Sequence, residues 1–212
     1  MICGDTRSPL VVRIGEKGLI WVKSTSSRKP VHDAHLHIGV NAIDLLLRAL
    51  KAPKSLEWKL SKVNEDVKVV IETVQCILIL ERITVSVGSL LGGTTPNLVP
   101  DATSAAADIR IVMGISADDS VRKTYKRLDD LQGVSFRGLR SIVSWICPSE
   151  DFVKLSLEVS RSVVRPRAAV NMRVGASDSR LFRKRGIPMA VAGLTRHGMG
   201  GADEHLMAEE LV

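Results

Sequence analysis

Hydrophobic and polar positions between residues 15 and 147 switch several times between the period of a strand and that of a helix. Residues 18–24 (GLIWVKS) are β-formers that predict a strand ending at the Ser/Thr run 24–27. In residues 39–52 the apolar side chains recur on one face, which predicts a helix that Pro53 ends. The same criteria predict strands at 82–90, 102–114 and 133–147, a loop at 91–101 and a second helix at 117–132. The order β-α-β-β-α-β is that of the ferredoxin-like sandwich, so we expect an α+β fold with an antiparallel sheet.

Residues 67–80 (VKVVIETVQCILIL) form the longest apolar stretch, and their pattern leaves strand and helix open. Enrichment in β-branched residues favours a strand, whereas the length of the stretch favours a helix. Residues 53–66 before it are polar and predict a loop. A membrane-spanning helix needs about 20 apolar residues, and this stretch is shorter and contains Lys68 and Glu72. We therefore expect no membrane partner.

After residue 147 the pattern changes to an alternation of helices and strands that is typical of an α/β layer. It predicts a helix at 150–163, a strand at 167–173, a turn at 175–179, a short helix at 179–185, a strand at 187–194 and a helix start at 206–212. Two strands are too few for a buried parallel sheet. We therefore expect this region to be an incomplete α/β segment of a larger domain.

Composition narrows the possible partners and the compartment. The net charge of +7 suits an anionic substrate, but the basic residues are spread out, with their densest stretches at 122–127 and 161–167 and little aromatic interleaving. We therefore expect no nucleic-acid partner. The three cysteines are far apart and odd in number, which argues against a disulfide framework. No signal-peptide pattern opens the chain, so a cytoplasmic location is expected.

Three of the five histidines, His32, His35 and His37, lie within the stretch VHDAHLHIGVNAI at 31–43. They could form a metal site, include one catalytic histidine with bystanders, or belong to a polar loop before a helix. In an extended segment His35 and His37 would share one face and His32 would point to the other. This spacing disfavours a three-histidine metal site.

Three blocks of sequence together resemble a family of zinc-dependent metallopeptidases that contains aminoacylases, acetylornithine deacetylases and succinyl-diaminopimelate desuccinylases. The blocks are GEKGLIWVK with RKPVHDAHLHIGVNAID, VSVGSLLGGTTPNLVPDATSAAADIR, and GASDSRLFRKRGIPMAVAGL followed by DEH. They occur in the family's order. The resemblance implies that residues 15–147 are a lid or dimerisation domain, and that residues 1–14 and 148–212 are part of a zinc-hydrolase catalytic domain. It also implies a homodimer formed through the lid.

The resemblance also implies roles for individual residues. His32 matches a lid histidine that reaches into the partner subunit's site and donates to the oxyanion. Asn97 would help to hold the substrate carboxylate or amide, although it could simply cap its turn. Arg180 would bind the substrate carboxylate; the alternative is a surface arginine. The family's last metal ligand is a histidine for which we choose His197 over His205.

Other features of the family have no counterpart in this sequence. Family members are roughly twice as long, and their metal-binding His-x-Asp motif is absent here, while the only Glu-Glu pair is Glu209–Glu210. We therefore expect a fragment of a hydrolase of N-acyl amino acids or short peptides, inactive alone and without stably bound zinc, of which the full-length family holds two ions. One alternative is a self-associating dimerisation or binding module; another is an enzyme completed by a separately encoded half.

Overall fold

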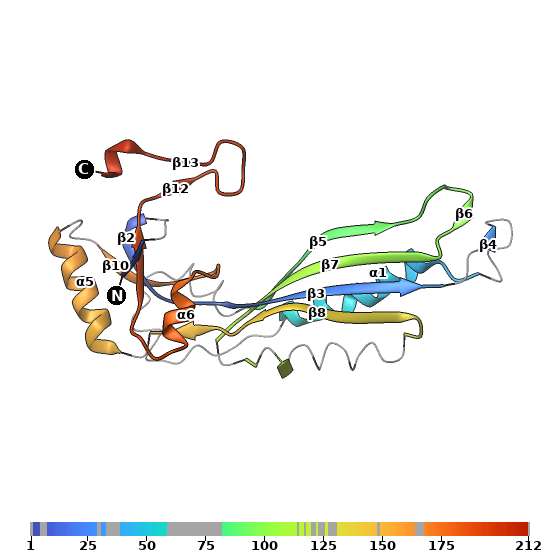
Figure 1. The fold of residues 1–212 in the computed structure, drawn as a ribbon, viewed down its shortest axis with the longest axis horizontal. Helices are drawn as coiled ribbons and strands as arrows, with labels where there is room; N and C mark the ends of the chain where they lie inside the picture. Colours follow the sequence, from blue (N-terminus) through green and yellow to red (C-terminus); the bar gives the residue numbers. More distant parts are fainter. Residues whose placement is uncertain are drawn as a thin grey trace. The chain divides into compact units, whose positions relative to one another are not determined.

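The computed structural model describes residues 2–4, 8–28, 31–32, 39–58, 82–113, 115–116, 118–119, 122, 126, 131–147, 149–163 and 168–211. The chain divides into two compact units (Figure 1). Unit 1 contains Met1–Lys17 and Ser144–Val212, and unit 2 contains Gly18–Ser61 and Arg82–Val143. The ambiguous stretch 67–80 and the histidines His35 and His37 lie outside the described residues.

Unit 2 is built on a four-stranded antiparallel sheet. Its strands are β3 (Gly18–Ser27), β5 (Thr84–Gly92), β7 (Ala102–Ile111) and β8 (Val134–Ile142). They lie in the order β5-β7-β3-β8, and each neighbouring pair is antiparallel. The first and third strands in chain order occupy the centre, and the second and fourth form the edges. The ferredoxin-like α+β prediction is therefore confirmed.

Helix α1 (Ala42–Lys54) connects β3 to β5 and begins where a side chain caps it. The Asn41 Oδ1 accepts hydrogen bonds from the backbone N–H groups of Ile43 (2.9 Å) and Asp44 (3.3 Å), which satisfies two of the donors left free at a helix start. The sequence predicted that Pro53 ends the helix, but the helix continues through Pro53 to Lys54. Pro53 lies buried in the last turn, and the chain continues into the 3-10 helix η2 (Ser55–Trp58).

The buried side of the unit 2 sheet carries the core, and α1 packs there through Leu46 and Leu50 against Ala105. Along β3 the buried positions alternate, beginning with Ile20 and Val22. The alternation continues through Ser24 and Ser26, so the strand is longer than the predicted 18–24 and includes the Ser/Thr run, ending at Ser27. The full ladder with β7 keeps these serines in the strand, because their partners Ala105 and Thr103 are small enough to pack against them.

A second, short antiparallel pair forms in unit 2 between β4 (Val31–His32) and β6 (Leu98–Val99). The stretch 91–101 had been predicted to be a loop throughout. The structure instead extends β5 to Gly92 and places β6 within it. Val99 is buried and gives this pair an apolar anchor. Within the predicted helix at 117–132, Asp118, Asp119, Arg122 and Lys126 are helical, whereas the described Leu131 and Gln132 at its predicted end are not.

Unit 1 contains a five-stranded mixed sheet. Its strands are β1 (Ile2–Gly4), β2 (Ser8–Glu16), β9 (Trp145–Ile146), β10 (Ala169–Arg173) and β11 (Ala190–Gly193), in the order β1-β11-β2-β10 with β9 also paired to β2. Strands β10 and β2 are parallel, whereas β11 and β9 run antiparallel to β2. The expectation of only two strands missed β1 and β2. The predicted strand at 133–147 is two strands, and β9 belongs to this sheet rather than to the sheet of β8.

The core of unit 1 forms around β2. Val12 and Ile14 are buried with Val170 of β10 and Ala190 of β11, while α5 (Glu150–Val163) covers them with partly buried apolar side chains. Helix α5 has the bounds predicted from its pattern. No described helix is long and apolar enough to cross a bilayer.

The C-terminal part of unit 1 carries the short elements that bear candidate residues. These are α6 (Ser179–Arg183), the hairpin of β12 (Arg196–His197) and β13 (His205–Leu206), and the 3-10 helix η3 (Ala208–Leu211). The helix predicted at 206–212 is therefore only this 3-10 turn. Gly198 and Gly200 have positive φ values of 62° and 83°, a conformation that glycine adopts without strain, and they allow the hairpin to turn.

Candidate functional site

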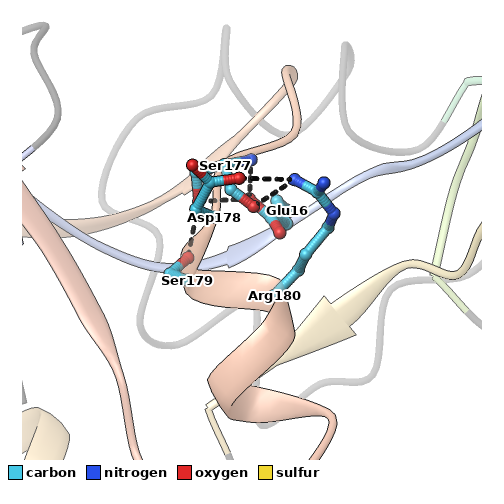
Figure 2. Close-up of polar contacts among 5 residues, drawn as sticks. All are labelled: Glu16, Ser177, Asp178, Ser179 and Arg180. Atoms are coloured by element: carbon cyan, nitrogen blue, oxygen red, sulfur yellow. Dashed lines mark hydrogen bonds and ion pairs between the residues drawn. The ribbon is translucent and has the colours of Figure 1, made fainter.

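The turn between β10 and α6 is tied to the end of β2 by a buried carboxylate. Glu16, the last residue of β2, is 1% exposed. Its Oε2 accepts two hydrogen bonds from Ser177, one from the backbone N–H and one from the hydroxyl group, both at 2.7 Å (Figure 2). The hydroxyl oxygens of Ser177 and Ser179 are 2.5 Å apart. Hydrogen bonds to an ionised acceptor are stronger than neutral ones, so this contact fixes the turn.

Arg180 extends from the start of α6 beside this turn (Figure 2). Its Nη1 donates to the Ser177 carbonyl oxygen at 2.6 Å and lies 3.5 Å from Oδ1 of Asp178. The Arg180 side chain is 17% exposed, whereas Asp178 is 83% exposed and so contributes little to holding it. Within the described part of the chain, Nε and Nη2 of Arg180 have no hydrogen-bond partner. A guanidinium held through Nη1 alone keeps the N–H groups of Nε and Nη2 available to donate to a carboxylate.

Glu16 and Ser177 were not singled out by the sequence analysis. Glu16 stands in the quoted block GEKG, directly after the alternating apolar positions of β2. A charged residue that ends an apolar strand was the available signal. Its partner, however, lies 161 residues further along the chain. The other carboxylate oxygen, Oε1, is buried and accepts no hydrogen bond from a described residue.

His32 and Asn97 come close together in unit 2 through the short strand pair. His32 of β4 lies opposite Leu98 of β6, and Asn97 directly precedes Leu98. Asn97 is exposed, and its side chain forms no hydrogen bond with another described residue. The turn-capping alternative therefore finds no support within the described chain. The side chain of His32 lies outside the description.

His197 lies in the exposed hairpin of unit 1 and faces His205 across it. The two imidazole rings are stacked, with centroids 5.2 Å apart and an angle of 15° between their planes. Nδ1 of His205 lies 2.7 Å from the carbonyl oxygen of Asp203, which suits an Nδ1–H donor. No hydrogen bond or ion pair joins His197 to Arg180 among the described residues.

A zinc centre is not supported by the residues that the structure describes. They contain no group of three or more His, Cys, Asp or Glu side chains that could hold a metal ion. Catalytic zinc takes about three protein ligands and keeps one open position. The stacked pair His197 and His205 supplies at most two imidazoles, so these residues alone do not fit the metal.

Comparison with known proteins gives a family and a fold. The family model described as peptidase dimerisation domain matches residues 14–134, whereas a comparison with curated protein sequences gives no match. Among solved structures, the chain is similar to a tripeptidase from Staphylococcus aureus, with 18% identity, a TM-score of 0.77 and coverage of 99% of this chain and 52% of that chain. It is also similar to a metallo-carboxypeptidase from Sulfolobus solfataricus, with 15% identity, a TM-score of 0.75 and coverage of 98% and 59%.

Human carnosine dipeptidase 1 shows the same likeness at 11% identity, with a TM-score of 0.68 and coverage of 91% of this chain and 52% of that chain. At these identities the likeness concerns the fold alone. The chain spans between about half and three fifths of the length of these structures.

Proposed function

This chain belongs to the peptidase dimerisation domain family, and on that premise we propose that it forms the lid and part of the catalytic unit of a metal-dependent amide hydrolase. The substrates would be N-acyl amino acids or short peptides. The fold likeness to a tripeptidase, a metallo-carboxypeptidase and a dipeptidase supports this class of reaction.

The observation that carries the proposal is the arrangement of Arg180. Its guanidinium is mostly buried, is held at Nη1 by the Ser177 carbonyl, and has two further nitrogens without a described partner. A surface arginine that served only solubility would be exposed and unrestrained. A planar fork fixed at one corner is suited to bidentate binding of a substrate carboxylate. Glu16 supports this function indirectly, because it fixes the turn from which Arg180 extends.

In unit 2, His32 and Asn97 are proposed to act on the amide itself. The pairing of β4 with β6 keeps the two residues within one short structural element. In a homodimer, His32 would donate a hydrogen bond to the oxyanion that forms in the partner subunit's site, where removing a donor costs about 3–4 kcal/mol of barrier. Asn97 would hold the substrate carboxylate or amide through its exposed carboxamide.

We propose zinc chemistry only for a site to which this chain contributes some of the residues. His197 would contribute one ligand, and the remaining ligands and the general base would come from polypeptide with no counterpart among the described residues. We therefore expect the chain alone to be inactive and assign no step of hydrolysis to a metal held by it.

A second candidate function is a self-associating module without catalysis, and strand β5 favours it. Edge strands of a sheet offer free backbone groups for pairing with another chain, and charged side chains discourage this pairing. Strand β5 (TVSVGSLLG) contains no charged residue, whereas the opposite edge β8 carries Arg137 and Arg140. A hollow of about 460 Å³ beside β5 is lined by Leu47, Leu50, Lys51, Lys54, Ser55, Glu57 and Val87. We infer that a homodimer would pair through β5.

An NMR titration of the full chain tests the role of Arg180. N-acetyl-L-alanine is added while the arginine side-chain Nε–H signals are recorded, and N-acetyl-L-alanine amide, which lacks the carboxylate, serves as the matched ligand control. We expect the acid to shift the Arg180 signal and the amide to leave it unchanged. The exposed Arg48 provides an internal reference. Equal shifts at both arginines, or equal effects of both ligands, would contradict carboxylate binding.

Zinc content and oligomeric state test the expectations that the two candidate functions make. After incubation with zinc and dialysis, the chain is assayed for bound metal and for hydrolysis of N-acetyl amino acids and dipeptides. Substantial zinc together with hydrolysis would show that the chain is an active enzyme and would overturn the expectation of inactivity. A monomer in light scattering would count against the dimerisation module and against the lid-mediated homodimer.

A further inference from the structure

The open face of the unit 2 sheet gathers basic side chains that are far apart in the sequence. Since α1 packs on the side of Ile20 and Val22, the alternate positions Trp21 and Lys23 of β3 point to the other side. Residues directly opposite each other in an antiparallel pair share a face. Trp21 lies opposite Arg140, and Lys23 lies opposite Arg137. Strands β3 and β8 lie side by side in the sheet (Figure 1). Their pairing therefore places these four side chains on one face.

Lys23 and Arg137 form a like-charged pair across neighbouring strands. Such pairs destabilise a sheet unless an anion lies between them. On the other side of Lys23 the register partner is Ala106, which offers no charge. Both side chains are exposed, and neither forms an ion pair with a described residue. The acid nearest in register on this face, Asp108, is bound by Arg110 at 2.7 Å.

Trp21 adds an aromatic surface to this basic face. The indole is 40% exposed although it lies in a central strand. The guanidinium carbon of Arg140 lies 5.2 Å from the ring centroid, as in a cation–π contact. A flat ring beside planar and cationic groups suits stacking of a nucleobase while the basic groups neutralise its phosphates.

The distribution of charge over the chain points in the same direction. Unit 2 contains 15 of the 30 Lys and Arg residues but only 9 of the 23 Asp and Glu residues. It therefore carries +6 of the net charge of +7. A positive surplus confined to one unit attracts polyanions toward that unit.

We propose that the open face of the unit 2 sheet, defined by Trp21, Lys23, Arg137 and Arg140, binds a single-stranded nucleic acid. This differs from the expectation drawn from the sequence, in which the basic residues looked dispersed. Strand pairing brings residues 21–23 next to residues 137–140, a proximity that no local pattern shows. A four-stranded antiparallel sheet whose aromatic side chains stack on bases is a known solution to single-strand binding. An acidic protein would satisfy the charges but would make no use of the exposed indole.

Fluorescence anisotropy of labelled oligothymidylate and oligouridylate, titrated with the full chain at several salt concentrations, tests the proposal. Removing both charges in Lys23→Gln/Arg137→Gln should weaken binding about tenfold and reduce the slope of log K against log salt by about 1.4, because each contact with a single strand contributes about 0.7. Trp21→Ala should weaken binding about tenfold through lost stacking and leave the slope unchanged.

The matched control removes two charges from α1, on the other side of the sheet. Arg48 and Lys51 are exposed there, and Arg48→Gln/Lys51→Gln should bind the oligonucleotides nearly as the unchanged chain does. Melting temperatures are recorded for every variant, and the single variants Lys23→Gln and Arg137→Gln replace the double variant if it does not fold. Equal losses in the two double variants would overturn the site. Equally tight binding of polyglutamate with no effect of Trp21→Ala would identify an acidic protein partner and overturn the nucleic-acid proposal.

Discussion

Ser177 donates two hydrogen bonds to the same oxygen of Glu16, one from its backbone and one from its side chain. The two residues are separated by 161 positions in the chain. Both are buried, so water cannot replace either bond if one partner is lost. The contact joins the end of β2 to the turn that precedes α6, and the position of Arg180 depends on it.

Substitution of Glu16 should destabilise unit 1 strongly. Glu16→Ala removes the acceptor of both bonds, leaves the buried N–H of Ser177 unpaired and leaves its hydroxyl only Ser179 as a partner. This should cost about 3 kcal/mol of unfolding free energy, since hydrogen bonds to charged groups contribute about 1.5–3 kcal/mol. Glu16→Gln should retain more of the stability, because its carboxamide oxygen can still accept. Hydrogen exchange of the β2 and β10 amides, recorded at increasing urea concentrations, measures the free energy of unfolding of each variant.

Glu158→Ala is the control for this prediction, because Glu158 is exposed on α5 of the same unit. It should leave the same amides unchanged. If Glu16→Ala and Glu158→Ala had equal effects, the buried contact would not be what stabilises the turn.

A methyl group at Gly15 should disrupt the pairing of β2 with β9 and β10. A Cβ there would lie 2.7 Å from Cε of Met172 and 2.9 Å from the carbonyl oxygen of Trp145. The methionine can move, but the carbonyl belongs to the backbone of β9. We expect Gly15→Ala to lower the unfolding free energy by about 2 kcal/mol, as overpacked cores do. Gly175→Ala is the control, because its nearest neighbour would be Nε of Arg173 at 3.5 Å. Thermal unfolding of both variants measures the difference.

The fold of unit 2 could be predicted from local periodicity because its elements are long and amphipathic. Strand β7, for example, alternates buried and outward positions over its whole length, and this alternation is visible in the sequence alone. The strands of unit 1 were harder to predict. Strand β2 contains Pro9 and Arg13 among its apolar residues, and its partners β10 and β11 come from the distant C-terminal part of the chain.

The residues of the candidate site could likewise be predicted only where the signal is local in the sequence. The turn before Arg180 was visible as a Gly- and Ser-containing break between a strand and a helix, so the arginine could be proposed from the sequence. Glu16 could not be proposed, because a single glutamate at a strand end is usually solvated. Glu16 is identified as a buried residue that fixes the turn only by its hydrogen bonds to Ser177. This tertiary contact leaves no signal in the local sequence.

Removal of metal ions should leave the stability of the chain unchanged. The described residues provide no group of three ligands, and the two stacked imidazoles of His197 and His205 are exposed. If the folded chain bound zinc and the free zinc concentration were 100 times its Kd, chelation would lower the free energy of unfolding by about 2.7 kcal/mol. Thermal unfolding with and without EDTA measures this directly. A clear fall in Tm with EDTA that His197→Ala abolishes would show that the chain holds a metal through this histidine.

If the homodimer pairs through β5, a charge introduced at this edge of the unit 2 sheet should weaken the dimer, and the same charge at the other edge should not. Leu91 at the end of β5 is 70% exposed, and Leu139 on the opposite edge β8 is 46% exposed. If chains pair through β5, Leu91→Lys places a charge in the contact and should shift the chain toward monomer in light scattering at a fixed concentration. Leu139→Lys adds the same charge at the other edge and should leave the dimer intact. The reverse result would assign the interface to β8, and dissociation by neither substitution would exclude both edges as the site of pairing.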